Sequence, residues 1–229
     1  MGKGNSEKIK LAIPKGRFLE WSQRLYEGLG GGTLSPKSLR GENSDNQIAI
    51  YFLNVVDIPH LVASGVVDYG IASDEWCLEL RHANNHTGGF EVHRTLKWIS
   101  TKLAFIADRD AEWPPPHGVR VATSFPALAK KILDEYKIKS YEILSLKGSV
   151  EACIPSLAYV GFDCVETGET LTANGLKIIH LPYADLGVSF IRNKSINPCS
   201  HLSFLNSLGQ VFDELERQGQ TDIHSILNR

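Results

Sequence analysis

The sequence predicts an α/β protein with largely parallel sheets. Short apolar, β-rich segments alternate with amphipathic helical segments along 229 residues, which is typical of helices packed on a parallel sheet. Hydrophobic residues make up 42% of the chain and charged residues 22%, as in ordinary globular proteins, so disordered and fibrous classes are excluded. The 24 basic residues are balanced by 26 acidic ones, which argues against a dedicated nucleic-acid binder.

The first part of the chain is expected to alternate strands with helices. Pro14 stops the first strand because proline cannot donate a ladder hydrogen bond, and the glycines at 30–32 end the helix that follows. Pro59 suits the first turn of a helix that begins at Asp57. The expected strands are residues 10–14, 47–53 and 66–71, and the expected helices are 18–29, 57–65 and a short one capped by Ser73 or Asp74.

The rest of the chain is expected to continue this alternation. Residues 91–107 are predicted to be extended, and the prolines at 114–116 mark a loop because they forbid ladder hydrogen bonds. Ser124 and Pro126 are typical of a helix start, and apolar side chains follow them at helical spacing. The further expected strands are 119–122, 141–146, 160–165, 176–181 and 188–192, and the last expected helix is 203–218.

The sequence also bears on metals, membranes and location. Four cysteines lie far apart without a CxxC pair, and the eight histidines lack metal-binding spacing, so no metal held by protein ligands alone is expected. No apolar run approaches the ~20 residues of a membrane span, and the polar N-terminus lacks the apolar stretch of a signal peptide. We therefore expect a cytoplasmic protein that binds neither membranes nor nucleic acid.

The most informative motif runs from Phe162 to Gly175. A strand is expected to end near Asp163, and a tight turn at Thr167 and Gly168 leads into a short helix. Successive backbone N–H groups in such a turn bind anions, and threonine hydroxyls add donors. Asp163 could accept hydrogen bonds from vicinal ribose hydroxyls, so the segment suits a sugar phosphate. An ordinary capped turn is the alternative.

Two further segments place glycines and charges after expected strands. Gly148 and Ser149 offer exposed N–H groups and Glu151 offers a carboxylate, although a surface turn is the alternative. Lys15 and Arg17 flank a glycine at the carboxyl end of a strand, where open α/β sheets bind ligands. These cations suit phosphate groups, and a solvated pair is the alternative.

Together these segments resemble the ATP phosphoribosyltransferase family, which performs the first step of histidine biosynthesis. The matching motifs occur in the family's order over most of the chain, and the last of them is specific. They are Leu11 to Arg17, Asp57 to Pro59, Gly65 to Ile71, Val121 to Pro126, Gly148 to Glu151 and Asp163 to Leu176.

The resemblance implies an α/β fold of two lobes resembling the periplasmic-binding-protein type II fold, with the active site in the cleft. The first lobe would be discontinuous, with residues 1–94 and 185–229, and the second would comprise residues 95–184. The family members are glycosyltransferases that join N1 of the adenine of ATP to C1 of phosphoribosyl pyrophosphate and release pyrophosphate. Mg²⁺ accompanies the phosphoribosyl pyrophosphate.

The resemblance also implies roles for individual residues. Asp163 would hold the ribose hydroxyls, and the loop that follows it would cradle the 5-phosphate. This loop comprises Glu166, Thr167, Gly168, Glu169, Thr170 and Leu171. The catalytic residues facing ATP or pyrophosphate would be Lys15, Arg17 and Glu151. Contacts to ATP would come from Asp68, Ser73, Gly148 and Ser149, with a helix or turn cap as the alternative for Asp68.

The chain length resembles the short form of the family, which lacks a C-terminal regulatory domain. Short forms resemble one half of a complex whose other member is a histidyl-tRNA-synthetase-like regulatory subunit. We therefore expect a homo-oligomer with such a subunit as partner, and ATP and phosphoribosyl pyrophosphate as its small-molecule partners.

The chain departs from the family pattern at charged positions. Residues 54–56 read Asn-Val-Val where the family usually has an arginine that helps to bind pyrophosphate, and Glu169 replaces a small or basic residue. Losing such a cation could lower the rate about 10²–10³-fold. The cations that could compensate are Arg40, Lys97, Lys102 and Lys147. Two alternatives follow: a divergent phosphoribosyltransferase acting on another adenine nucleotide in a specialised nucleoside pathway, or a non-catalytic ligand-binding or regulatory paralogue.

Overall fold

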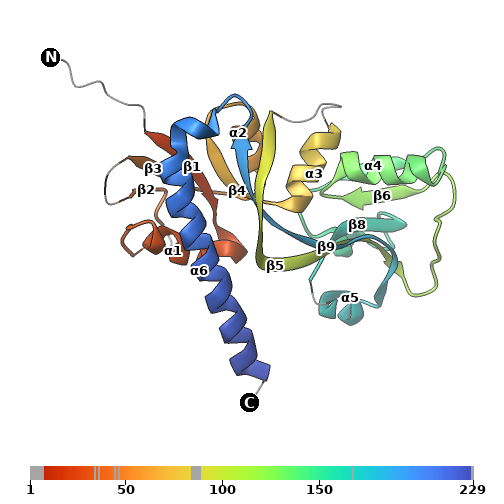
Figure 1. Ribbon diagram of the computed structural model, residues 1–229. Helices are drawn as coiled ribbons and strands as arrows, with labels where there is room; N and C mark the ends of the chain where they lie inside the picture. Colours follow the sequence, from red (N-terminus) through yellow and green to blue (C-terminus); the bar gives the residue numbers. More distant parts are fainter. Residues whose placement is uncertain are drawn as a thin grey trace. The chain divides into compact units, whose positions relative to one another are not determined.

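The contacts of the chain divide it into two compact units. The structure is a computed structural model that describes residues 8–33, 35, 37–43, 45, 47–83, 89–166 and 168–227, with side chains of the last helix described as far as Gln218. Unit 1 comprises Met1–Ser73, Thr87–Trp98 and Val188–Arg229, and unit 2 comprises Asp74–His86 and Ile99–Gly187. Each unit combines a sheet with helices, as the sequence predicts (Figure 1).

The sheet of unit 1 has the strand order β2-β3-β1-β4-β9. Its strands β1 (Ile9–Pro14), β3 (Ile48–Leu53) and β4 (Tyr69–Ser73) are parallel, whereas β2 (Arg40–Glu42) and the last part of β9 (Leu176–Asn193) pair antiparallel. Buried and half-buried residues alternate along β3, because successive side chains of a strand point to opposite faces.

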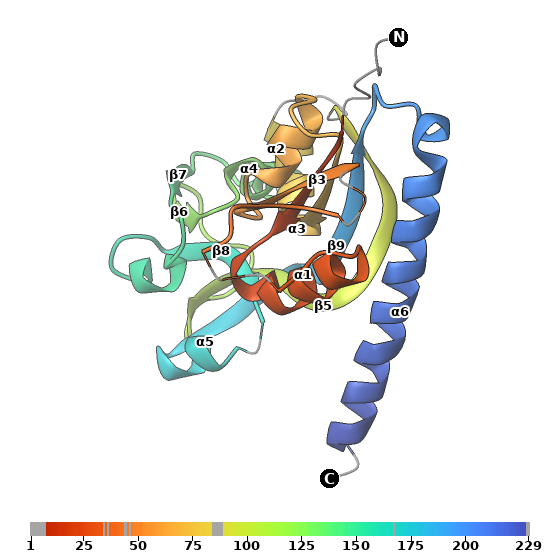
Figure 2. The same ribbon diagram turned by 90° about the vertical axis from the view of Figure 1, so that its left-hand side faces the viewer.

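Helix α6 covers one side of unit 1. It lies alongside α1 and the first part of β5 (Phe90–Asp108), as Figures 1 and 2 show. Its buried side chains recur at helical spacing on one face and are Phe204, Leu208, Phe212 and Leu215. The described helical segments of this unit are η1 (Gly16–Phe18), α1 (Leu19–Gly28), α2 (Ile58–Ala63), η3 (Pro198–His201) and α6 (Leu202–Leu227).

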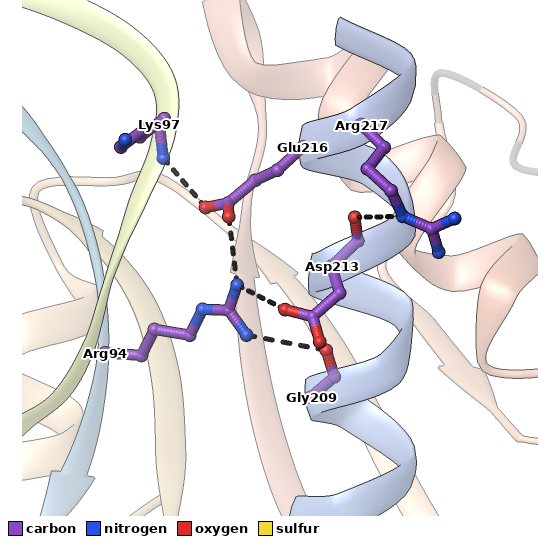
Figure 3. Close-up of polar contacts among 6 residues, drawn as sticks. All are labelled: Arg94, Lys97, Gly209, Asp213, Glu216 and Arg217. Carbon is purple, nitrogen blue, oxygen red and sulfur yellow. Dashed lines mark hydrogen bonds and ion pairs between the residues drawn. The ribbon is translucent and has the colours of Figure 1, made fainter. Parts of the chain in front are cut away.

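A cluster of charged groups joins α6 to β5 through hydrogen bonds (Figure 3). The Arg94 guanidinium donates to the carboxylates of Asp213 at 2.7 Å and Glu216 at 2.9 Å, and it lies 5.5 Å from the centre of the Phe212 ring. The backbone N–H of Lys97 donates to the other oxygen of Glu216 at 3.1 Å. Partial burial lowers the pKa of Arg94, but the hydrogen bonds that its guanidinium donates to the two carboxylates raise the pKa above its ordinary value.

The sheet of unit 2 has the strand order β5-β8-β6-β7. Its strands β6 (Arg120–Thr123), β7 (Glu142–Ser145) and β8 (Val160–Val165) are parallel, and the second part of β5 pairs antiparallel with β8. Apolar side chains pack on both faces of this sheet. One cluster includes Phe105, Leu128, Ile132 and Phe162, and another includes Ile106, Ile154, Val165 and Leu171. The described helical segments are α3 (Asp74–Ala83), α4 (Pro126–Glu135), η2 (Val150–Cys153) and α5 (Glu169–Ala173).

The amino end of α4 is capped by a carboxylate from α3. Glu79 is 8% exposed and accepts hydrogen bonds from the N–H groups of Ala127 at 2.8 Å and Leu128 at 3.0 Å. The residue at the N-cap position of α4 is Phe125, whose side chain has no oxygen to offer. A residue distant in sequence therefore satisfies the free donors of this helix.

The units differ from the expected lobes in one longer segment, and residues 95–98 and 185–187 also fall in the other unit. Residues 1–94 and 185–229 were expected to form one lobe and residues 95–184 the other, whereas residues 74–86 group with unit 2 because α3 packs against α4.

Strand β9 is continuous where the sequence predicts two strands separated by a break. Hydrogen bonds within unit 2 hold the stretch after Pro182 in place. The Ser100 hydroxyl donates to Asp185 at 2.6 Å, and the N–H of Gly187 donates to the carboxylate of Asp74 at 2.9 Å. Tertiary contacts therefore override the weak strand propensity of this stretch.

Candidate active site

The carboxyl ends of three parallel strands form one edge of the sheet in unit 2. Strands β6 and β7 end side by side at Thr123 and Ser145, and β8 pairs with Thr123 at Phe162 and continues three residues further to Val165. Open parallel sheets bind ligands at this edge, just beyond the strand ends. We call it the carboxyl edge of unit 2. The loop after β8 carries the residues expected to bind phosphoribosyl pyrophosphate, and the loop after β7 carries residues expected to contact ATP.

Asp163 lies on β8, two residues before this edge. Its backbone pairs with Ala104 of β5, its side chain is half-buried, and its carboxylate accepts a hydrogen bond from the N–H of Cys164 at 2.9 Å. Side chains alternate along a strand, so the side chain of Asp163 lies on the same face of the sheet as a side chain at position 161 would. A Cβ atom added to Gly161 would lie 2.6 Å from Val150 of η2. Asp163 and η2 therefore share one face of the sheet.

The loop after β8 turns into α5 through a glycine. Gly168 has φ +76°, a left-handed conformation that favours glycine. The helix begins where the N–H of Thr172 donates to the Gly168 carbonyl at 3.1 Å. The N–H groups of Glu169, Thr170 and Leu171 lie in the first turn, which has no acceptors for them within the helix. This turn therefore presents donors suited to an anion.

The side chains of this loop lie in different surroundings. Leu171 is 4% exposed in the core, so only its backbone is available to a ligand. Glu166, Glu169 and Thr170 are exposed. The exposure of Glu169 matters because a carboxylate turned toward a phosphate would repel it. Thr167, which the sequence also places in this loop, lies outside the described residues.

The loop after β7 contains two residues in left-handed conformations. Gly148 has φ +107°, and Ser149 has φ 55° and ψ 36°. Such a conformation costs a non-glycine residue roughly 1 kcal/mol, and strain of this kind clusters at functional sites. Both residues are exposed, whereas Val150 is fully buried and anchors the loop. Glu151 is half-buried in η2.

Two lysines lie beside the same edge. Lys147 follows β7 and is exposed. Lys102 of β5 pairs with Val165, the last residue of β8, and it is also exposed. Directly paired residues of adjacent strands project to the same face, so Lys102 lies next to the start of the loop after β8. The structure thus places two of the four possible compensating cations at the carboxyl edge of unit 2.

In unit 1 the carboxyl strand ends carry Lys15, Arg17 and Ser73. Lys15 follows β1, and its N–H extends the ladder by donating to the Leu53 carbonyl of β3 at 2.9 Å. Arg17 is exposed, with its guanidinium carbon 4.8 Å from the centre of the Phe18 ring. Ser73 ends β4 and is 1% exposed, and its hydroxyl has no hydrogen-bond partner among the described residues.

The other two cations belong to unit 1. Arg40 begins β2 and pairs with Tyr51 in the second half of β3, so it lies near the strand end that precedes residues 54–56. Lys97 lies on β5, where its backbone N–H binds Glu216 of α6. Arg40 is therefore the cation of this pair that is close to the carboxyl strand ends of unit 1.

Asp68 lies at the opposite end of β4 from Ser73. It precedes Tyr69, the first residue of that strand, because β4 begins three residues later than the expected strand at 66–71. Its carboxylate accepts the N–H of Lys10 at 2.7 Å, and its own N–H donates to the Lys10 carbonyl at 3.0 Å. Asp68 therefore joins the amino ends of β1 and β4, and its expected contact with ATP stays a prediction.

The part of the chain that the structure describes contains neither a cluster of metal ligands nor a membrane-spanning helix. No three His, Cys, Asp or Glu side chains in the described part of the chain are grouped so that they could hold a metal. Magnesium bound to a polyphosphate substrate needs only one or two protein carboxylates, so the half-buried Asp163 and Glu151 fit that lesser requirement. None of the described helices is long and apolar enough to cross a membrane.

The fold and the loops after the strands define a broad class of protein. Such proteins consist of two α/β units whose strand-end loops are suited to binding phosphorylated small molecules. The family model described as ATP phosphoribosyltransferase (HisG) matches residues 55–210. An ATP phosphoribosyltransferase of Alkaliphilus metalliredigens is 36% identical over 176 residues, which cover 74% of this chain and 80% of that protein. One of Clostridioides difficile is 30% identical over 213 residues, covering 91% and 98%. The chain belongs to the ATP phosphoribosyltransferase family, a family of glycosyltransferases.

A solved structure supports the same assignment. The chain is similar to one in the ATP phosphoribosyl transferase (HisG:HisZ) complex from Thermotoga maritima, with a TM-score of 0.75 and 25% identity. The match covers 90% of this chain and 99% of that one. The expected two-lobed α/β fold class is therefore confirmed. The range matched by the family model contains the loops after β7 and β8 but not Lys15 or Arg17.

Proposed function

We propose that this chain joins N1 of the adenine of ATP to C1 of phosphoribosyl pyrophosphate and releases pyrophosphate, the first step of histidine biosynthesis. Membership of the family supports this activity. The observation that carries it is the carboxyl edge of unit 2. There Asp163 and the first turn of α5 adjoin the glycine-containing loop after β7.

In this proposal the carboxyl edge of unit 2 binds phosphoribosyl pyrophosphate. Asp163 accepts hydrogen bonds from the ribose hydroxyls, and the N–H groups of residues 169–171 bind the 5-phosphate, because helix starts favour anions. Lys102 and Lys147 add positive charge for the pyrophosphate. Mg²⁺ accompanies the donor and, when bound, neutralises charge on the leaving group, with Asp163 and Glu151 as the carboxylates available to it.

We assign the strand ends of unit 1 to the phosphates of ATP or of pyrophosphate. Arg17 can bind phosphate through two donors, whereas Lys15 acts as a point charge. The buried Ser73 hydroxyl is available as a further partner. Gly148 and Ser149 of unit 2 are assigned to ATP on the same basis of exposed donors. Displacement at C1 needs alignment of two polyanions and stabilisation of the leaving group rather than a protein nucleophile.

A second candidate function is transfer to another adenine nucleotide. Residues 54–56, which follow β3, contain no cation, whereas Lys15 after β1 and Arg40 on β2 lie close to that strand end. A cation on a strand other than β3 would suit an acceptor nucleotide with a different number or arrangement of phosphates. The acceptor preference is therefore the property that separates the two candidates.

We also propose that the chain forms a homo-oligomer in the cytoplasm and binds a histidyl-tRNA-synthetase-like regulatory subunit. Its similarity to a chain of a HisG:HisZ complex supports this assembly.

Pyrophosphate release by the purified chain tests the proposed function. We expect release with ATP, phosphoribosyl pyrophosphate and Mg²⁺, and a product whose mass and fragmentation show a ribosyl group on adenine N1. Release with AMP, ADP or adenosine but not with ATP would favour the second candidate. No release with any acceptor, with or without the regulatory subunit, would contradict both and indicate a non-catalytic binding protein.

Asp163→Ala tests the donor site directly. Loss of a charge-assisted hydrogen bond to the ribose should raise the KM for phosphoribosyl pyrophosphate about 10- to 100-fold and leave the KM for ATP nearly unchanged. Asp134→Asn is the matched control, because this exposed carboxylate of α4 accepts a hydrogen bond from the Tyr141 hydroxyl at 2.7 Å. An unchanged KM for phosphoribosyl pyrophosphate in Asp163→Ala would remove Asp163 from the site.

A further inference from the structure

We propose that Thr123 is a positioning residue for the donor site and holds the loops after β7 and β8 in register. The inference rests on the proposed function, because its consequence is the binding of phosphoribosyl pyrophosphate. Thr123 acts through the backbone of its neighbours and does not itself contact the substrate.

Thr123 is a fully buried residue with hydrogen bonds in three directions. It is the last residue of β6, and none of its surface is exposed. Its hydroxyl donates to the Phe162 carbonyl at 2.7 Å and accepts from the N–H of Phe125 at 2.8 Å. Its own carbonyl accepts from the N–H of Leu146 at 2.9 Å. Thr123 therefore links the end of β6 to Phe162 within β8 and to the residue that follows β7.

The hydroxyl acts on β8 at the residue before Asp163. The paired residues of β6 and β8 end with Thr123 opposite Phe162, and beyond this point β6 leaves the sheet toward α4. On its other side Asp163 is held by its pairing with Ala104 of β5. The Thr123 hydroxyl is therefore the last described contact from β6 that restrains β8 before the ribose-binding carboxylate.

The carbonyl of Thr123 acts on the loop after β7. Leu146 lies two residues before Gly148, where the chain enters its left-handed turn. On the other side of that turn, Val150 is fully buried against Ala122, the neighbour of Thr123 on β6. The loop is thus fixed at both ends to two consecutive residues of one strand.

The third partner supplies rigidity. Phe125 precedes α4, and the Glu79 carboxylate caps the first turn of that helix through two N–H groups. The Thr123 hydroxyl is consequently oriented by the Phe162 carbonyl, which accepts from it, and by the Phe125 N–H, which donates to it. Phe125 is in turn held in place by the packing of α3 against α4. A hydroxyl held between two buried partners has one defined position, which is what alignment of two loops requires.

The functional consequence follows from the tolerance of binding sites to displacement. A misplacement of about 1 Å can cost about 10²-fold in rate, so a smaller shift of Asp163 and its loop should cost about tenfold in donor binding. Valine has the shape of threonine without the hydroxyl, and serine keeps the hydroxyl. Thr123→Val should therefore impair binding of the donor, and Thr123→Ser should preserve it.

The test compares Thr123→Val, Thr123→Ser and Thr101→Val with the unmodified chain. Thr101 is a matched control, because it is a 3% exposed threonine of β5 whose hydroxyl has no hydrogen-bond partner among the described residues. Steady-state pyrophosphate release gives kcat and both KM values. Calorimetric titration with phosphoribosyl pyrophosphate and Mg²⁺ gives a Kd that needs no turnover.

We expect Thr123→Val to raise the KM and the Kd for phosphoribosyl pyrophosphate about tenfold. The KM for ATP should rise as well, because the loop after β7 carries Gly148 and Ser149, which are assigned to ATP. Thr123→Ser should stay within about twofold of the unmodified chain, and Thr101→Val should match it. Unchanged donor KM and Kd in Thr123→Val would overturn the proposal. So would a lower kcat with unchanged KM values, because a role in stability alone reduces only the number of active molecules.

The same series separates failure of this proposal from failure of the proposed function. If the unmodified chain binds phosphoribosyl pyrophosphate but does not use ATP, the proposed function fails while the Kd values still decide the role of Thr123. If it does not bind phosphoribosyl pyrophosphate, both fail. Should Thr123→Val not fold, Thr123→Cys carries the same expectation, because a thiol keeps the size of the side chain and is a weak donor.

Discussion

Removal of the Glu79 carboxylate should destabilise unit 2 through the amino end of α4. In Glu79→Ala, the N–H groups of Ala127 and Leu128 lose their acceptor, and Leu128 is fully buried. Loss of a capping side chain costs about 0.5–2 kcal/mol, and a buried donor left without a partner costs about 1–3 kcal/mol. The release of a buried carboxylate offsets part of this cost, so we expect a net loss of about 2 kcal/mol.

Urea unfolding followed by circular dichroism at pH 7 measures this loss. For a chain of this length, about 2 kcal/mol also corresponds to a melting temperature lower by roughly 4–8 °C. Glu135→Ala is the matched control, because Glu135 lies on the same helix in an exposed ion pair with Lys131. Such a pair contributes about 0.3–0.5 kcal/mol. Equal stability of the Glu79→Ala and Glu135→Ala proteins would refute the capping role of Glu79.

Two further predictions concern charged groups. Burial raises the pKa of Glu79 above its ordinary 4.5, although two backbone hydrogen bonds lower it. The folded state therefore binds more protons than the unfolded state above pH 4.5, and this contribution to stability falls as pH rises through the raised pKa. Urea unfolding should show that the unfolding free energy of the unmodified chain exceeds that of Glu79→Gln by more at pH 4 than at pH 7. An equal difference at the two pH values would contradict the raised pKa of Glu79. Arg94→Leu should lower the unfolding free energy by about 1–2 kcal/mol and speed hydrogen exchange in α6, because two carboxylates lose their shared partner. Lys8→Met, which removes one exposed ion pair of unit 1, should change neither quantity, and equal effects of the two variants would contradict the anchoring role.

The sequence was sufficient for features that depend on local pattern. Apolar runs and their period located most strands and helices, including β3, β8 and α4. Glycines after strands located the turns at residues 148 and 168, both of which have positive φ. Local signals succeed here because strand period and turn conformation are set by a few consecutive residues.

The features that were missed depend on residues distant in sequence. The cap of α4 comes from Glu79, which carries no local sign of that role. The exchange of hydrogen bonds between Asp68 and Lys10 requires β1 and β4 to be adjacent, so the local sequence could not predict it. The link from Thr123 to Phe162 likewise exists only after β6 and β8 have paired.

A crystal structure of the chain with phosphoribosyl pyrophosphate and Mg²⁺ would show whether the carboxyl edge of unit 2 binds the donor. We expect the 5-phosphate within hydrogen-bond distance of the N–H groups of residues 169–171, and the ribose hydroxyls on the carboxylate of Asp163. The pyrophosphate should lie beside the loop after β7. A donor bound away from the carboxyl ends of β6, β7 and β8, or bound there without contact to Asp163, would contradict the proposed donor site.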